Sequence, residues 1–250
     1  MSRTFILAAG LALCSALPAA AFDPAQMSGA EKSAFDAAVR AYLLENPEVI
    51  MEAVAVLQQR EMDAQLSNDQ ALAQSYLEDI QNDGYSWVGG NPEGDITIVE
   101  FTDYRCGYCR KAFEEVEELV KADGNIRIIL KEFPILGEGS ENSSKFAIAV
   151  KSLYGDETYK SVHDALIQMR ADATLDNLRA LADTLGLDGE TISQKMESFE
   201  VADIIGRNRA LGEKLAISGT PTFVFNDTLV RGYEPLQAMQ ARVAALREKS

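Results

Sequence analysis

Two cysteines separated by two residues are the part of this sequence best suited to chemistry, in the run Cys106-Gly107-Tyr108-Cys109. Residues 95–101, just before them, are mostly β-branched or aromatic and predict a buried strand, while residues 110–122 predict an amphipathic helix. Cys106 should therefore lie at a helix N-terminus, where free backbone N–H groups and the helix dipole favour a thiolate. We expect Cys106 to attack disulfides and Cys109, one turn inside the helix, to resolve the mixed disulfide.

A passive disulfide and half of a structural zinc site are the alternatives to a redox role. A disulfide across two residues closes a very short loop and constrains the unfolded chain little. A zinc site needs further Cys or His ligands, and the single histidine of the chain is His163. Redox catalysis is therefore the interpretation that we favour.

The beginning of the chain predicts export. A short positive region with Arg3 precedes an apolar stretch over 4–17, too short to span a bilayer, and Ala19-Ala20-Ala21 offers a cleavage site. We expect a signal peptide over 1–21, whose removal takes Cys14 away and leaves Cys106 and Cys109 as a single pair. A lipoprotein site at Cys14 fits less well, because the residue before it is a leucine.

The formal net charge of −16 argues against nucleic acid and anionic membrane surfaces as partners. No later apolar run is long enough to span a membrane. We therefore expect a soluble protein of an oxidising exported compartment, with no membrane anchor.

Residues 22–84 predict a helical segment apart from the rest. Ser28 and Glu31 form a capping-box pattern, and Asn46-Pro47 ends the first helix and begins a second. Two helices with one apolar face cannot bury that face on themselves. It must pack on the same chain or on other copies of the chain. The polar residues 58–70, with a potential break at 67–69, resemble a tether and favour self-association.

Residues 85–250 predict a mixed α/β domain. A second strand over 125–133 ends at Pro134, and residues from about 140 to 215 are helical with short breaks. Strands follow at 222–225 and 228–230, and a final helix at 235–248.

Three motifs in this order resemble one group of proteins. They are Cys106–Cys109, the run Lys131-Glu132-Phe133-Pro134, and the run from Ser218 to Phe223. Together they resemble the DsbA-like disulfide proteins of the bacterial periplasm. With Cys-Gly-Tyr-Cys and the run from Tyr42 to Ile50, the chain is most similar to the ScsC-like group. The resemblance implies an α/β thioredoxin fold with an all-helical insertion at about 140–215, preceded by an N-terminal helical oligomerisation segment.

The resemblance also implies roles for single residues. Pro221 resembles the cis-proline beside the active-site sulfurs, and the backbone of Thr220 would then bind substrate chain in strand fashion. Glu100 would accept the proton of the resolving thiol, with Lys131 as its basic partner. The alternative is a solvent-facing Glu100 paired with Lys131. We also expect Tyr108 to contact substrate.

The middle residues differ from those of the DsbA oxidases, which carry Cys-Pro-His-Cys. Without an imidazole beside Cys106, one source of thiolate stabilisation is absent, so we expect a less oxidising couple.

The favoured interpretation is a periplasmic thiol–disulfide isomerase without a bound cofactor. Its expected partners are misfolded exported proteins with disulfides, a membrane reductase of DsbD type, and further copies of the chain joined through residues 22–84, a trimer by preference. The alternatives are a dithiol oxidase, a protein that binds Cu(I) through Cys106 and Cys109, and a holdase that depends on its N-terminal helices.

Overall fold

The computed structural model describes residues 27–248, which fall into two units divided between Glu61 and Met62. The predicted signal peptide at 1–21 lies outside the described residues.

The N-terminal unit is helical. Helix α1 spans Gly29–Glu45, and helix α2 spans Glu48–Ser75 and continues past Glu61 into the second unit. The capping box is confirmed, because Ser28 and Glu31 bond each other reciprocally. None of the residues of α1 is buried. Large apolar side chains of the unit are exposed, among them Val39, Tyr42, Ile50, Met51, Val54 and Leu57.

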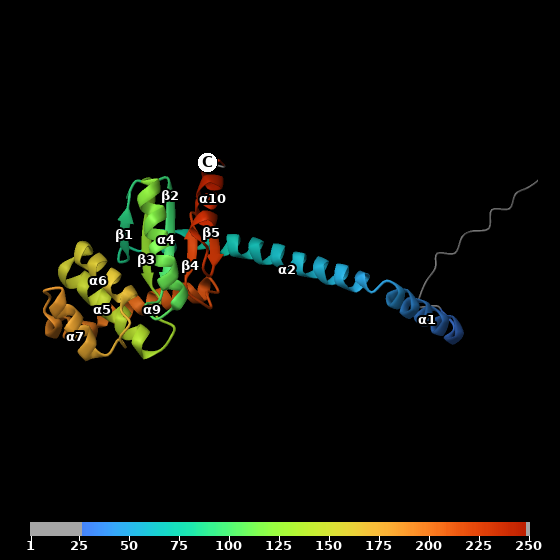
Figure 1. Cartoon of the computed structure of the whole chain (residues 1–250), viewed down its shortest axis with the longest axis horizontal. Helices are drawn as coiled ribbons and strands as arrows, with labels where there is room; N and C mark the ends of the chain where they lie inside the picture. The colour runs from blue at the N-terminus through green and yellow to red at the C-terminus, as the bar shows by residue number, and fades with distance from the viewer. Residues whose placement is uncertain (1–26, 249–250) are drawn as a thin grey trace, which may run out of the picture. The chain divides into compact units, whose positions relative to one another are not determined.

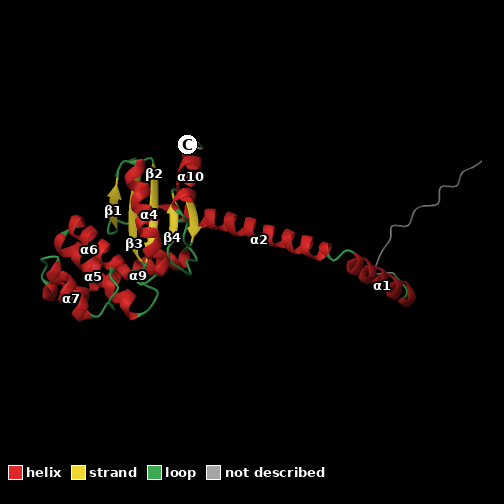
Figure 2. Ribbon diagram, viewed as in Figure 1, coloured by secondary structure: helices red, strands yellow, loops and turns green. Residues whose placement is uncertain are grey.

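The second unit is built on a five-stranded sheet with strand order β1-β3-β2-β4-β5 (Figure 2). Strands β2 and β3 are parallel, and the other neighbours are antiparallel. The strands are β1 Trp87–Gly90, β2 Ile96–Thr102, β3 Ile126–Glu132, β4 Thr222–Phe225 and β5 Thr228–Arg231. The predicted strands are confirmed. Strand β1 was not predicted, because a four-residue run that ends in two glycines has little strand character.

Helices cover both faces of this sheet (Figure 1). The predicted helices after the cysteines and at the C-terminal end are α4 Gly107–Asp123 and α10 Leu236–Arg247. The helical insertion comprises α5 Glu138–Tyr154, α6 Asp156–Gln168, α7 Leu175–Thr184, α8 Gly189–Met196 and α9 Phe199–Lys214. This is the thioredoxin fold with an all-helical insertion that the sequence predicts.

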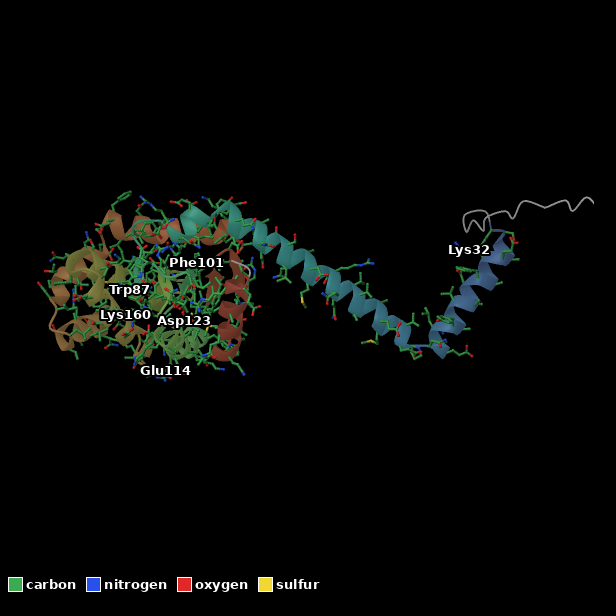
Figure 3. All side chains as sticks on the ribbon, turned by 90° about the horizontal axis from the view of Figure 1, so that it is seen from above. Lys32, Trp87, Phe101, Glu114, Asp123 and Lys160 are labelled. Carbon is green, nitrogen blue, oxygen red and sulfur yellow. The ribbon has the colours of Figure 1, made fainter. Side chains whose placement is uncertain are left out.

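Each face of the sheet has its own hydrophobic core. Ile98 and Phe223 pack with α4, α10 and the insertion on one face. Val99 and Phe101 pack on the other face with Ala73 of α2 and with Ile80 of the short helix α3, Leu77–Gln81. In Figure 3, Phe101 of β2 and Glu114, which belongs to α4, lie on different sides of this unit. The alternation of β2 side chains thus places neighbouring residues in different environments.

Residues 62–84 are part of this compact unit, whereas the sequence analysis assigned them to the N-terminal segment. The side chain of Asp69 is bound by two nitrogens of the Arg231 guanidinium, at 3.0 Å and 2.6 Å. Residues 67–69 do not break helix α2, and Ile80 is fully buried. The polar stretch is therefore a helix with a packed end rather than a tether.

Among residues 27–248, no helix combines the length and the apolar composition needed to cross a membrane.

Candidate active site

The two cysteines lie where the sequence places them. Cys106 is the N-cap of α4, with extended backbone angles, and its N–H donates to the carbonyl oxygen of Asp103 at 3.0 Å. Cys109 lies inside the first turn of the helix and is fully buried, while Cys106 retains 8% of its surface. The two thiols are not joined in the structure, which therefore describes the dithiol form.

The environment shifts the two thiols in opposite directions. A hydrogen bond from the Cys109 thiol lowers the pKa of Cys106 well below its usual range, and the backbone N–H groups of Tyr108 and Cys109 add to the effect against the opposing effect of burial. Burial raises the pKa of Cys109, and its hydrogen bond to Cys106 raises it further. Cys106 is therefore the more acidic of the two thiols, while the attacking role of Cys106 and the resolving role of Cys109 stay predictions.

A cis peptide bond joins Thr220 to Pro221, as predicted. This bond lies against the reactive sulfur, because Cys106 Sγ donates to the carbonyl oxygen of Thr220 at 3.1 Å. Thr220 Oγ1 is buried and is the single side-chain N or O atom in the described part of the chain to be buried without a hydrogen-bond partner.

Glu100 is buried beneath the cysteines, with 5% of its surface exposed. This burial raises its pKa to about 8, and the charges of Glu117 and Cys106 add to the shift. The solvent-facing alternative for Glu100 is therefore wrong. Its charge in turn contributes to the raised pKa of Cys109, so the carboxyl group is near enough to this thiol to interact with it electrostatically. The proton-accepting role itself stays a prediction.

The predicted pair of Glu100 with Lys131 is not formed. In the β2–β3 register Glu100 lies opposite Leu130, and Phe101 lies opposite Lys131. Because side chains alternate along a strand, Lys131 belongs to the face of Phe101, away from the cysteines. Its ammonium binds the carboxylate of Asp83 and the carbonyl oxygen of Asp79. A catalytic role of Lys131 through Glu100 would have to act across the sheet.

Asp103 is a residue of the site that the sequence analysis missed. Its fully buried carboxylate accepts hydrogen bonds from Arg105 N at 2.8 Å, Ser140 Oγ at 2.7 Å and Ile135 N at 2.8 Å. Its backbone touches both thiol residues, through the bond from Cys106 N and a contact of its own N–H with Cys109 Sγ at 3.5 Å. Asp103 lies three residues before the N-cap of α4, and its carboxylate accepts a hydrogen bond from the backbone N–H two residues later. Aspartate is a preferred residue for such a turn, so the sequence does contain this signal.

A second buried carboxylate, Glu132, lies at the end of β3. It accepts hydrogen bonds from Tyr104 at 2.7 Å, Tyr159 at 2.6 Å and Ser144 at 2.7 Å. Burial raises its pKa to about 7 despite these three donors. His163 Nδ1 lies 3.0 Å from the Tyr104 hydroxyl, and burial lowers the pKa of this histidine to about 3, so its ring is neutral. Glu132 belongs to the motif Lys131-Glu132-Phe133-Pro134, but its sequence context predicts no function for it.

Tyr108, between the two cysteines, is 62% exposed. Its ring is therefore available to a bound polypeptide, and substrate contact stays a prediction for it.

The Cu(I) alternative depends on Cys106 and Cys109 without further ligands. Within residues 27–248, no three His, Cys, Asp or Glu side chains are arranged to hold a metal ion. Two thiolates suffice for Cu(I) in principle, so the alternative stays a prediction.

The comparison with known proteins agrees with this geometry. Residues 97–244 match the family of DSBA-like thioredoxin domains. The chain belongs to this family. Residues 31–64 also match the N-terminal domain of the copper resistance protein ScsC. The DSBA-like match covers strands β2 to β5, the cysteines, the insertion and most of α10, and it leaves out β1. The ScsC match covers most of α1 and the first part of α2.

Solved structures show the same relationship. A thioredoxin-like oxidoreductase from Silicibacter pomeroyi is 41% identical, with a TM-score of 0.64, over 68% of this chain and 97% of its own. ScsC of Proteus mirabilis in a transitional conformation is 26% identical, with a TM-score of 0.65, over 91% of this chain and 100% of its own.

Curated relatives share only part of their length with this chain. The Na⁺/H⁺ antiporter NhaA 1 of Salinispora arenicola is 26% identical over 63% of this chain, which spans only 24% of the antiporter. The thiol:disulfide interchange protein DsbC of Escherichia coli K12 is 27% identical over 60% of this chain and 51% of its own length. The chain thus spans about a quarter of the first of these relatives and about half of the second.

Proposed function

We propose that this protein is a thiol–disulfide oxidoreductase that isomerises disulfides in exported proteins. The observation that supports this best is that the pKa values of the two thiols are shifted in opposite directions. Cys106 has a lowered pKa at the helix N-cap against the Thr220 carbonyl, and Cys109 is buried with a raised pKa. An accessible thiolate attacks disulfides at neutral pH, and a protonated neighbour waits for the second step.

The reaction begins when the Cys106 thiolate attacks one sulfur of a substrate disulfide. A disulfide forms between Cys106 and the substrate, and the other substrate sulfur leaves as a thiolate. In isomerisation, a substrate thiolate later attacks the mixed disulfide and releases Cys106, so no electrons are gained or lost overall. If Cys109 attacks first, the two cysteines form a disulfide and the substrate leaves reduced by two electrons.

The second outcome leaves the protein oxidised, and a reductant must restore the dithiol. We propose a membrane reductase of DsbD type for this step, in a bacterial periplasm that the chain reaches through its predicted signal peptide. Misfolded exported proteins with disulfides are the proposed substrates.

The N-terminal unit favours isomerase over dithiol oxidase. Its apolar side chains at α1 and the start of α2 are exposed within the chain, and the ScsC N-terminal match covers these helices. Exposed apolar helices of this kind are stable when copies pack together. We propose a homo-oligomer, a trimer by preference, that surrounds a substrate with several copies of Cys106.

Reactivation of a scrambled multi-disulfide ribonuclease tests this function. The chain that begins at residue 22 is expected to reactivate it, whereas the chain that begins at Met62 oxidises reduced substrate but reactivates poorly. The variant Cys106→Ala controls for non-specific effects and should show neither activity. If both chain lengths oxidise and neither reactivates, the protein is a dithiol oxidase. Stoichiometric Cu(I) binding without disulfide exchange would support the copper alternative.

A further inference from the structure

A pair of stacked tyrosines lies beside the catalytic cysteines. Tyr108 stands between Cys106 and Cys109 in the first turn of α4, and Tyr233 lies in the connection between β5 and α10. Their ring centroids are 6.1 Å apart, and the ring planes differ by 28°. Two segments separated by more than a hundred residues thus form one aromatic surface next to the reactive sulfur.

Two contacts of Tyr233 and one of the nearby Leu236 hold this segment on α4. The Tyr233 hydroxyl donates to Glu115 Oε1 at 2.7 Å, and Leu236 N donates to the other oxygen of the same carboxylate at 2.7 Å. The Lys111 ammonium lies 4.2 Å from the centroid of the Tyr233 ring, within the range of a cation–π interaction. Lys111 and Glu115 both belong to α4, so the helix that carries the cysteines also fixes the tyrosine.

The consequence concerns Tyr108. A tyrosine with 62% of its surface exposed ordinarily samples several rotamers, and ordering it on binding costs conformational entropy. Stacking on a ring that is itself anchored reduces that freedom before substrate arrives. The exposed part of the Tyr108 ring is then available to a polypeptide that is bonded to Cys106.

We propose that Tyr233 is a positioning residue that holds Tyr108 as a stacking surface for an aromatic side chain next to the reactive cysteine of the substrate. The proposal rests on the proposed thiol–disulfide function and adds a preference among its substrates. Aromatic rings stack in offset or edge-to-face geometry, so a Phe, Tyr or Trp beside the substrate cysteine gains an interaction that alanine lacks.

A single-turnover reaction isolates this interaction. The reduced chain that begins at residue 22, with Cys109→Ala so that Cys106 is its single cysteine, is mixed with a short peptide whose one cysteine is bonded to thionitrobenzoate. The Cys106 thiolate attacks the peptide sulfur, the Cys106–peptide disulfide forms, and thionitrobenzoate leaves as a coloured thiolate, because the more acidic thiol leaves faster. Varying peptide concentration separates the half-saturating concentration from the maximal rate. Two peptides are compared, with phenylalanine or alanine next to the cysteine.

The expected result is a selective change in the half-saturating concentration. Tyr233→Ala should raise it for the phenylalanine peptide by about 2- to 10-fold, the range of a single aromatic pair, with much less change for the alanine peptide. The maximal rate should change little. Tyr233→Phe keeps the ring and should restore most of the preference. Tyr154→Ala, at a tyrosine with 38% exposure on α5 of the insertion, is the matched control and should leave the preference intact.

A double-mutant cycle tests whether Tyr233 acts through Tyr108. With Tyr108→Ala already present, Tyr233→Ala should have no further effect on the preference. The proposal would be overturned if Tyr233→Ala raised the half-saturating concentration equally for both peptides. It would also be overturned if Tyr233→Ala had its full effect on the preference in the Tyr108→Ala background. If neither peptide forms a mixed disulfide with any variant, the thiol–disulfide function fails instead, and the two failures are therefore distinct.

Discussion

The Sγ atom of Cys106 lies 3.1 Å from the carbonyl oxygen of Thr220, the residue in cis linkage to Pro221. Cys106 is the N-cap of α4, whereas Thr220 lies two residues before the start of β4. The attacking sulfur thus lies against a backbone segment that a substrate chain could pair with. In the proposed reaction, recognition of a polypeptide and attack on its disulfide would use the same few atoms.

The first prediction concerns the acidity of Cys106. Cys109→Ala removes the thiol whose hydrogen bond is the largest cause of the lowered Cys106 pKa, so this pKa should rise. A hydrogen bond to a charged group contributes about 1.5–3 kcal/mol, which corresponds to a rise of about one to two pH units. The thiolate absorbance of Cys106 followed against pH measures the shift. An unchanged or lower pKa in Cys109→Ala would contradict this account of the site.

The second prediction concerns how stability depends on pH. Glu100 has a folded-state pKa of about 8 against an ordinary value of 4.5, so the folded protein keeps a proton that the unfolded chain releases. The stabilisation is fully present below the ordinary value and is lost as pH rises through about 8. Glu100→Gln stays neutral, so its free energy of unfolding should fall less than that of the wild type across this range.

Urea unfolding of the oxidised protein measures this dependence, because the cysteines do not titrate in a disulfide. Glu114→Gln, at an exposed position on α4, is the matched control and should keep the slope of the wild type. Parallel slopes for wild type and Glu100→Gln would show that Glu100 is ionised in the folded state.

The third prediction concerns Lys131. Its ammonium is fully buried and is bound to Asp83, so Lys131→Met leaves a carboxylate with little exposure and without its cation. Breaking such a pair costs about 3–5 kcal/mol of unfolding free energy. The pair Lys160–Asp164 is a half-exposed comparison, and Lys160→Met should cost about 1 kcal/mol or less.

The same variant tests a catalytic role for Lys131. Because Lys131 and Glu100 belong to different faces of the sheet, Lys131→Met should leave the pH dependence of Cys109 attack unchanged in the folded protein. Glu100→Gln should alter that dependence. A shift of the same size in both variants would restore the predicted partnership of the two residues.

The fourth prediction concerns the boundary between the units. A chain that begins at Met62 keeps the Asp69–Arg231 and Asp83–Lys131 ion pairs, so it should fold and unfold cooperatively as a monomer. A chain that begins at Tyr85 loses both partners and leaves Lys131 buried without a counter-ion. We expect it to be less stable by several kcal/mol or insoluble. Molar mass in solution and urea unfolding compare the two, and equal stability would show that residues 62–84 contribute nothing to the domain.

Much of the architecture follows from local sequence patterns. The strand before Cys106, the helix after it and the capping box at Ser28 each depend on residues within a few positions of one another. Periodicity and capping are local effects, so a sequence reveals them without knowledge of the fold. The order of the motifs around Cys106 and Pro221 was likewise sufficient to predict the family and the cis peptide bond.

The tertiary structure alone decided which distant side chains meet. The register of β2 against β3 separates Glu100 from Lys131, and it brings Glu132 onto the same face as Glu100. Buried hydroxyls from α5 and α6 then surround Glu132. Asp83, which binds Lys131, belongs to the segment 22–84 that was predicted to be separate from the domain. Strand register depends on long-range pairing, and a shift by one residue exchanges the two faces. The chain's local pattern therefore specified the reactive thiols, and packing between remote segments specified the charges that surround them.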